Sequence, residues 1–201
     1  MRFVQIMALS AVAASFVLAT CLYAVMPETL ASHWDSSGNV NGYMPRFWGL
    51  FLMPFVSIGI LLLFWIIPRI DPLKRNIQRF RSYFDWFVIF ILGFLFYVYL
   101  LTVFWNLGYR FNMTVFLLPG LSVLFYYIGV LMSNAKRNWF IGIRTPWTLS
   151  SDRVWEKTHR LGSLLFKISA VASLSCLVFP KYCVVIFLAV VLVAGLVPVV
   201  Y

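Results

Sequence analysis

Long apolar runs alternate with short polar segments along this chain of 201 residues. Five of the runs carry no charged side chain, and each has about the 20 residues that an α-helix needs to cross roughly 30 Å of hydrocarbon. The runs are Phe3–Met26, Phe47–Ile67, Trp86–Trp105, Phe111–Met132 and Tyr182–Tyr201. This pattern predicts five membrane-spanning helices.

A sixth apolar run, Leu161–Phe179, differs because Lys167 lies inside it. The stretch after Lys167 is too short to cross a bilayer alone, but the whole run is long enough if the lysine extends its ammonium group to the nearby interface. We therefore predict an all-α integral membrane protein, a bundle of six transmembrane helices.

Composition supports a membrane protein, since 63% of the residues are hydrophobic and only 11% are charged. Soluble domains are about half apolar and about a quarter charged. The net charge of +10 is also a feature of proteins that bind nucleic acid. Here the basic residues flank the apolar runs, so we predict contact with membrane lipid and no direct binding of nucleic acid.

The basic residues also predict the orientation of the chain. If the amino terminus is cytoplasmic, twelve basic residues fall inside and three outside, with Lys167 left out, and this bias places both termini in the cytoplasm. The inner set is Arg2, Arg69, Lys74, Arg75, Arg79, Arg81, Lys136, Arg137, Arg144, Arg153, Lys157 and Arg160, and the outer set is Arg46, Arg110 and Lys181.

Two polar connections stand out and divide the chain. Residues 1–133 form an amino-terminal four-span region with an outer loop at 27–46, and residues 134–201 hold an inner loop at 134–160 and two carboxy-terminal spans. In the outer loop, Asp35–Gly38 and Asn41-Gly42 are turn signals. In the connection between the second and third spans, Asp71-Pro72 predicts a short helix with proline at its first position.

The inner loop has a composition that a simple connector does not need. It contains three tryptophans, Trp139, Trp147 and Trp155, and the turn sequence GIRTPW. Such a composition predicts a folded loop that contacts another molecule. Two explanations of the tryptophans stay open: they seat the loop on the membrane, or they form a protein interface.

Catalytic chemistry has weak candidates in the inner loop. Asp152, Glu156 and His159 have the spacing of one helical face, which would suit acid–base catalysis. However, Ser150 or Ser151 can cap a helix there, and the acidic residues precede the basic ones in the order that the helix dipole favours. With no nucleophile and base pair in sight, we predict a capped helix, no catalytic residues and no enzyme.

A metal or cofactor site is not predicted either. The two histidines, His33 and His159, fall on opposite sides of the predicted bilayer. Glu28, His33 and Asp35 could form a weak outer site, but we favour a hydrogen-bonded structural histidine. A transporter remains the alternative function, because Pro119-Gly120 could kink or break the fourth span.

The two loops resemble known sequences. The outer PETLASHWDSSGNVNGY resembles the motif of a bacterial and archaeal membrane domain of unknown function, and the inner NWFIGIRTPWTLSSDRVWEKTHRLG resembles the signature of the SdpI family of immunity proteins. The resemblance covers nearly the whole chain. It departs at Asp35, where the family often has Asn, and at Asn41, where it often has Asp.

The resemblance implies a multi-pass protein of the cell membrane that protects its cell from a secreted hydrophobic peptide, the sporulation-delaying or cannibalism toxin of Bacillus in the family's case. It also implies a receptor that captures a cytosolic repressor protein; the alternative is a small-molecule or peptide transporter or exporter. The implied partner-binding residues are Gly142, Arg144, Thr145, Pro146, Trp147, Thr148, Trp155, Lys157, Thr158, His159 and Arg160, and those of the outer motif are His33, Trp34, Gly38, Gly42 and Tyr43.

Overall fold

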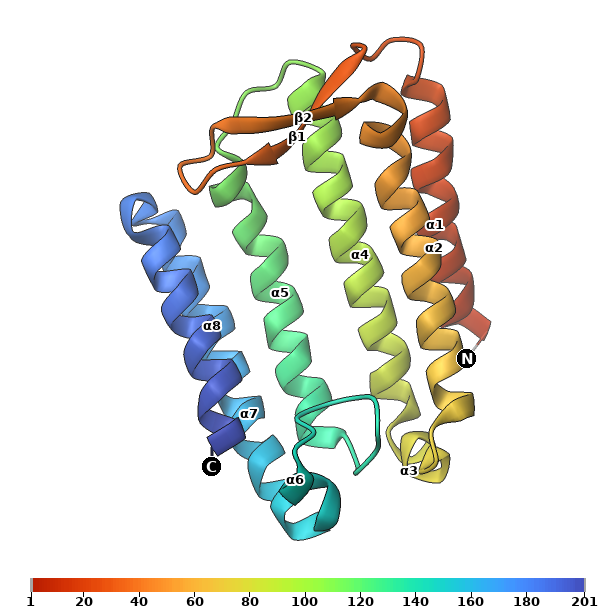
Figure 1. Cartoon of the computed structure of the whole chain (residues 1–201), viewed down its shortest axis with the longest axis vertical. Coiled ribbons are helices and arrows are strands. Elements are labelled where there is room, and N and C mark those ends of the chain that lie inside the picture. Colours follow the sequence, from red (N-terminus) through yellow and green to blue (C-terminus); the bar gives the residue numbers. More distant parts are fainter. Residues whose placement is uncertain (1, 201) are drawn as a thin grey trace.

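Six long helices run between two polar ends of the molecule in the computed structural model, which describes residues 2–200 (Figure 1). All six are long and apolar enough to cross a membrane. They are α1 (Arg2–Leu22), α2 (Arg46–Ile70), α4 (Arg81–Asn106), α5 (Met113–Asn134), α7 (Asp152–Ser173) and α8 (Cys183–Val200). The structure therefore has a candidate membrane-spanning helix at each of the six predicted spans.

A small sheet at one end makes the all-α prediction incomplete. Strands β1 (Thr29–Trp34) and β2 (Val40–Pro45) pair antiparallel and lie across the end of the bundle, which we call the hairpin end (Figure 1). Asp35 shapes the connecting turn, because its Oδ1 accepts hydrogen bonds from the backbone N–H groups of Ser37 and Asn39. Gly38 supplies the positive φ of 83° that this turn needs.

The prediction of a second turn at Asn41-Gly42 was wrong. Both residues lie within β2, and Gly42 does not have a positive φ. A Cβ atom on Gly42 would lie 2.8 Å from the Cβ of His33 on β1. The glycine therefore allows a close approach of the strands beside the irregular register between Ala31 and Trp34.

The opposite end, which we call the loop end, carries the short helices α3 (Lys74–Arg79) and α6 (Pro146–Ser150) and both chain termini (Figure 1). The prediction that a helix starts at Pro72 was wrong, because α3 begins at Lys74. Asp71 instead accepts a hydrogen bond from the N–H of Leu73 and closes a turn before the helix.

Helix α7 also differs from the predicted sixth span. It begins at Asp152, capped by the side chain of Ser151, so the second half of the inner loop is helical and continues directly into the bundle. It ends at Ser173 and is followed by two turns of 3-10 helix, Leu174–Leu177 and Pro180–Tyr182. The predicted capped helix is confirmed.

Small residues allow α5 and α7 to pack closely. A Cβ on Gly129 of α5 would lie 2.8 Å from the backbone oxygen of Ser163, and a Cβ on Gly162 of α7 would lie 2.4 Å from Met132. Ser122 of α5 also donates a hydrogen bond to the carbonyl oxygen of Ala170. In lipid, where hydrophobic burial between helices is weak, close packing and such bonds hold helices together.

Helix α5 is continuous through Pro119, so the fourth predicted span is not broken at this proline. A Cβ on the next residue, Gly120, would lie 2.6 Å from the ring of Tyr97 on α4. The proline–glycine pair therefore lets α4 approach α5 closely.

Candidate functional site

The segment between α5 and α7, residues 135–151, which we call the signature loop, is folded around the buried side chain of Asn138. Asn138 is fully buried. Its Nδ2 donates to the carbonyl oxygens of Lys136 and Ile141, and its Oδ1 accepts from the N–H groups of Phe140 and Ile141. One side chain thus satisfies four backbone groups that the turn would otherwise bury without partners. The sequence prediction missed this residue.

His159 fixes the next part of the loop. The imidazole is buried; its Nδ1–H donates to the carbonyl oxygen of Trp155 at 2.8 Å, and its Nε2 accepts from the N–H of Ile143 at 3.0 Å. These two bonds require a neutral ring with its proton on Nδ1. The ring also stacks on Trp155 at a centroid distance of 3.9 Å.

Gly142 is placed against this histidine. Its φ is 104°, and a Cβ atom there would lie 2.3 Å from His159 Nε2. Both the backbone conformation and the space exclude a side chain. The packing of the loop on α7 therefore requires the glycine in the GIR part of the predicted motif.

Trp155, Thr145, Thr148 and Thr158 are buried as well. Trp155 Nε1 donates to the carbonyl oxygen of Ala135 at 2.9 Å, which ties α7 to the end of α5. Thr145 and Thr148 form a reciprocal capping box at the start of α6, with Pro146 as its first residue. The four buried side chains hold the loop's shape and are not available at its surface.

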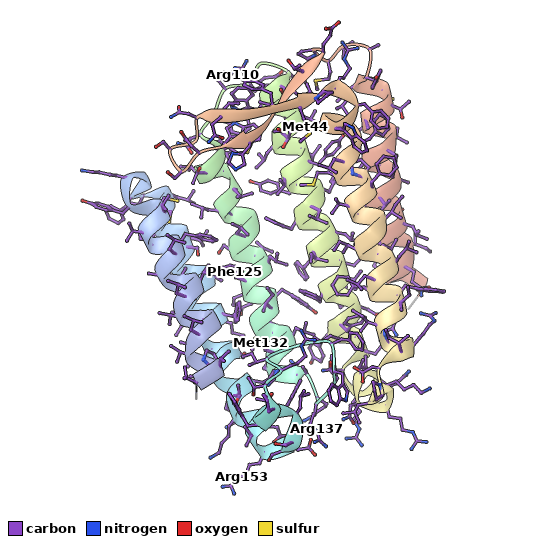
Figure 2. The ribbon with its side chains drawn as sticks, viewed as in Figure 1. Met44, Arg110, Phe125, Met132, Arg137 and Arg153 are labelled. Carbon is purple, nitrogen blue, oxygen red and sulfur yellow. The ribbon has the colours of Figure 1, made fainter. Side chains whose placement is uncertain are left out.

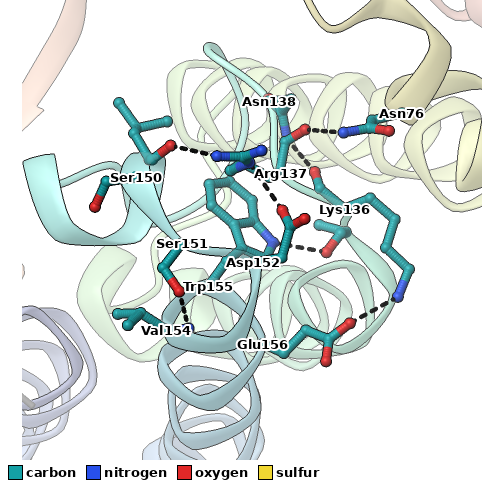
Figure 3. A network of polar contacts seen from close by, with 12 residues as sticks. Asn76, Lys136, Arg137, Asn138, Ser150, Ser151, Asp152, Val154, Trp155 and Glu156 are labelled. Atoms are coloured by element: carbon teal, nitrogen blue, oxygen red, sulfur yellow. Dashed lines mark hydrogen bonds and ion pairs between the residues drawn. The ribbon is translucent and has the colours of Figure 1, made fainter.

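The loop is also joined to the connection between α2 and α4. Asp71, which is 2% exposed, accepts a hydrogen bond from the N–H of Trp139 at 2.9 Å, and Asn76 donates to the carbonyl oxygen of Arg137 at 2.8 Å. Figure 3 shows the Asn76 contact beside the ends of α5 and α7. The two polar segments of the loop end thus form one cap.

The three residues considered for acid–base catalysis are engaged separately. Asp152 Oδ1 lies 2.8 Å from Arg137 Nε in an ion pair that lacks the alignment of a hydrogen bond, while the Nη1 of Arg137 donates to Leu149 (Figure 3). Glu156 pairs with Lys136 at 3.3 Å. Since His159 is buried with both nitrogen atoms bonded, the three groups do not gather around a common space.

A second set of predicted residues lies on the surface of the loop end. Arg144, Pro146, Trp147, Lys157 and Arg160 are exposed. Trp147 is 47% exposed and Trp139, outside the predicted set, is 50% exposed. Arg144 Nη1 donates to the carbonyl oxygen of Trp139 at 2.8 Å, so the arginine and this tryptophan lie together.

The signature loop closes one end of an apolar pocket of about 350 Å³, the inner pocket. Its walls come from α2, α4, α5 and α7, and Phe140–Ile143 of the loop complete it. The helical lining includes Phe64, Phe87, Ile128 and Phe166. Changes in the loop's shape would therefore change this pocket.

At the hairpin end, the sheet is attached to the bundle by asparagines. Asn106, at the end of α4, accepts from the N–H of Ala31 at 2.8 Å and donates to its carbonyl oxygen at 3.0 Å. Asn112 donates to the carbonyl oxygen of Ser37 and lies against Gly38, where a Cβ would be 2.5 Å from its Oδ1. The close contact with Asn112 therefore explains why position 38 of the predicted motif is a glycine.

The other outer-motif residues are spread over the hairpin. His33 Nδ1 pairs with Asn41 Oδ1, Trp34 meets Trp105 edge to face at 5.6 Å, and Tyr43 is 65% exposed. Because Asp35 holds the turn, it does not join His33 and Glu28 in a metal site. Within residues 2–200, no group of three or more histidine, cysteine or acidic residues could hold a metal ion.

A second pocket, the outer pocket of about 300 Å³, lies between the hairpin and α2, α4 and α5. His33, Trp34 and Met44 line it from the hairpin, and Met53 and Met113 line it from the helices. Figure 2 shows Met44 at this end of the molecule and Arg137 and Arg153 at the other.

Comparison with known proteins supports the motif-based reading. Residues 134–201 match the SdpI/YfhL protein family, and residues 11–58 match a domain of unknown function, DUF1648. The predicted resemblance to the SdpI family is confirmed. The chain is also 26% identical over 159 residues to the immunity protein SdpI of Bacillus subtilis (strain 168), which covers 79% of this chain and 74% of that protein.

The matched segments correspond to parts of the fold described above. The SdpI/YfhL segment comprises the signature loop, α7 and α8, and the DUF1648 segment comprises the second half of α1, the hairpin and the first half of α2. No solved structure matches the chain. With six helices able to span a membrane and similarity to the immunity protein SdpI, the chain is a multi-pass protein of the cell membrane.

Proposed function

We propose that the protein is a membrane immunity protein, which protects its own cell from a secreted hydrophobic peptide toxin. The observation that carries the proposal is the similarity to the immunity protein SdpI, which extends over 79% of the chain. The six-helix architecture suits such a role, because a membrane-active peptide meets the protein in or at the bilayer.

The orientation that this function needs follows from charge. The hairpin and the two short helices α3 and α6 lie at opposite ends of the bundle (Figure 1). At this loop end, α3 holds Lys74, Arg75 and Arg79, and the signature loop holds Lys136, Arg137 and Arg144. By the positive-inside rule the loop end and both termini are cytoplasmic. The hairpin, its motif residues and the outer pocket then face the medium from which a toxin arrives.

The loop end supplies a second surface, for a cytosolic partner protein such as a repressor. Tryptophan and arginine are the residues that dominate protein interfaces, and Trp147, Trp139 and Arg144 are exposed there. The buried bonds of Asn138 and His159 hold the loop in one shape before a partner arrives. Preorganisation of this kind lowers the entropic cost of binding.

The immunity function is tested in Bacillus subtilis cells that lack their own SdpI and are exposed to its toxin. Expression of this chain should raise survival by about tenfold or more over cells with an empty vector. A chimera in which residues 27–46 are replaced by those of the Bacillus protein tests whether the hairpin sets toxin specificity. The proposal is contradicted if cells with the chain and cells with the chimera are killed as readily as cells with the empty vector, although both proteins are present in the membrane.

The partner-binding role is tested by Arg144→Ala. The substitution removes an exposed cation and its bond to the Trp139 carbonyl, so partner capture in a membrane pull-down should fall while membrane insertion stays normal. Lys157→Ala removes another exposed cation of the predicted motif, on α7, and its effect on partner capture is compared with that of Arg144→Ala. Unchanged recruitment by the Arg144 variant would remove this residue from the proposed interface.

A further inference from the structure

In the described part of the chain, the outer edge of β1 is hydrogen-bonded to the rest of the protein, and the outer edge of β2 is not. The N–H of Arg46 donates to the carbonyl oxygen of Glu28 at 2.8 Å, so the pair Glu28–Arg46 faces inward between the strands. Paired residues alternate along an antiparallel ladder between bonded and non-bonded positions. With Leu30 opposite Met44 and Ala31 opposite Tyr43, the pair Ala31–Tyr43 is therefore of the non-bonded kind, and its backbone groups point away from the ladder.

The contacts of β1 confirm this direction. Both the N–H and the carbonyl oxygen of Ala31 are bonded to the side chain of Asn106, which lies outside the ladder. The backbone groups of Tyr43 must then point outward from the opposite edge, on β2. Within residues 2–200, neither a side chain nor a backbone group outside the hairpin bonds them.

Proline is already accommodated at one outward position of this edge. Pro45 lies opposite Thr29, one step along from the inward pair Glu28–Arg46, and it has no N–H to donate. A proline at an outward position costs the ladder no hydrogen bond. The edge of β2 therefore offers one donor and one acceptor at Tyr43 and a further acceptor at Pro45.

The outer pocket adjoins this edge. Met44 lies between the two outward-facing residues and lines the pocket, together with Trp48 and Leu52 of α2 and Met113 and Leu117 of α5. Methionine side chains adapt to differently shaped apolar partners. Within the described residues, the lining includes no Asp, Glu, Lys or Arg. Burying a charged group there would lack a compensating partner, so the pocket matches an uncharged apolar side chain.

We propose that an extended, uncharged, apolar peptide segment adds to the edge of β2 as a third strand. Its backbone bonds to Tyr43, and one of its side chains enters the outer pocket. In this mode of recognition, backbone bonds provide affinity and the pocket provides selectivity. The proposal rests on the proposed function in one respect: it names how a peptide toxin is engaged at the hairpin end.

The test measures binding of a defined probe to the purified full-length chain in lipid nanodiscs. The probe is a fluorescent, capped octapeptide of alternating valine and threonine with a central leucine. A second probe carries an N-methyl group on every residue, which removes the N–H donors along both edges. Tyr43→Pro removes the outward N–H of β2, and Tyr43→Ala is the matched control that removes only the side chain.

Loss of backbone hydrogen bonds should raise the Kd of the probe by about fivefold or more for Tyr43→Pro. Tyr43→Ala should stay within about threefold of the unsubstituted chain. The N-methylated probe should bind the unsubstituted chain at least about fivefold more weakly, which tests the same bonds in a correctly folded protein.

Equal affinity of both probes for the unsubstituted chain would overturn strand addition, as would equal affinity of the two variants for the first probe. Efficient disulfide cross-linking between two copies of a Tyr43→Cys chain that lacks the three native cysteines would also overturn strand addition, because a second copy would then occupy the edge.

Cell survival separates this proposal from the immunity function. Full protection by Tyr43→Pro rejects strand addition alone, and failure of the unsubstituted chain to protect while it binds the probe rejects immunity alone.

Discussion

The two caps of the bundle are built in different ways. At the loop end, Asn138, His159 and Asp71 are buried, and their polar atoms bond to the backbone of the cap itself. At the hairpin end, the sheet is held by Asn106 and Asn112 from outside, and the edge of β2 stays open. Trp34 Nε1 is buried there without a partner among the described residues. One cap is held together by its own buried polar side chains, and the other leaves a strand edge without hydrogen-bond partners within residues 2–200.

The largest effect is expected from Asn138→Ala. It leaves four buried backbone groups without their partner, so the free energy of unfolding should fall by about 3 kcal/mol or more. Thermal unfolding in detergent measures this loss. Asn39→Ala, at an exposed position of the hairpin turn, is the matched control and should change stability by less than about 0.5 kcal/mol. Equal losses for the two variants would contradict a self-supporting loop.

Gly142→Ala should have the next largest effect. The substitution combines a strained φ of 104° with a collision against His159 Nε2. Gly108→Ala has the same kind of strain, with a φ of 106°, but open space around the new Cβ. The strain alone costs about 1–2 kcal/mol, and the collision adds to it only at Gly142. A Gly142 variant no less stable than the Gly108 variant in thermal unfolding would show that His159 does not confine the loop.

Asp71→Asn should weaken the joint between the loop and the α2–α4 connection. Each carboxylate oxygen accepts one N–H, from Leu73 and from Trp139, and an amide offers only one oxygen. We expect a loss of about 1–3 kcal/mol in the free energy of unfolding and faster hydrogen exchange at Trp139. Asp152→Asn, at an exposed ion pair, should cost less than about 1 kcal/mol. The idea of one joined cap fails if exchange at Trp139 is unchanged.

The smallest effect on global stability is expected from Asn106→Leu. It removes the two bonds to Ala31, so the hairpin should exchange its amide protons faster, while the unfolding of the bundle shifts by about 1 kcal/mol. Thr102→Val, which removes a bond within α4 itself, is the control. Local exchange no faster in the Asn106 variant than in this control would mean that other contacts hold the sheet.

The sequence was sufficient to predict the long helices, because five of the six spans are long charge-free runs and lipid leaves the backbone few alternatives. It was also sufficient to indicate the two motif regions. The hairpin was missed because its strands are six residues long and irregular between Ala31 and Trp34, which hides the alternation of a regular strand.

The role of individual motif residues could not be predicted in the same way. His159 and Trp147 stand in one polar segment, yet the first is 2% exposed and the second 47% exposed. Which face of the segment is buried depends on its packing against α5 and the α2–α4 connection, and these contacts join residues far apart in the chain. Asn138 and Asp71 were missed for the same reason, since a loop asparagine or aspartate carries no periodic signal.

The central claim is that the loop end faces the cytosol and the hairpin end faces outward. Two variants in a background without the native cysteines test it directly, Trp147→Cys in the signature loop and Tyr109→Cys after α4, both at exposed positions. A membrane-impermeant thiol reagent applied to intact cells should label the cysteine at 109 at once, and the cysteine at 147 only after permeabilisation. Labelling of the cysteine at 147 in intact cells would contradict the account.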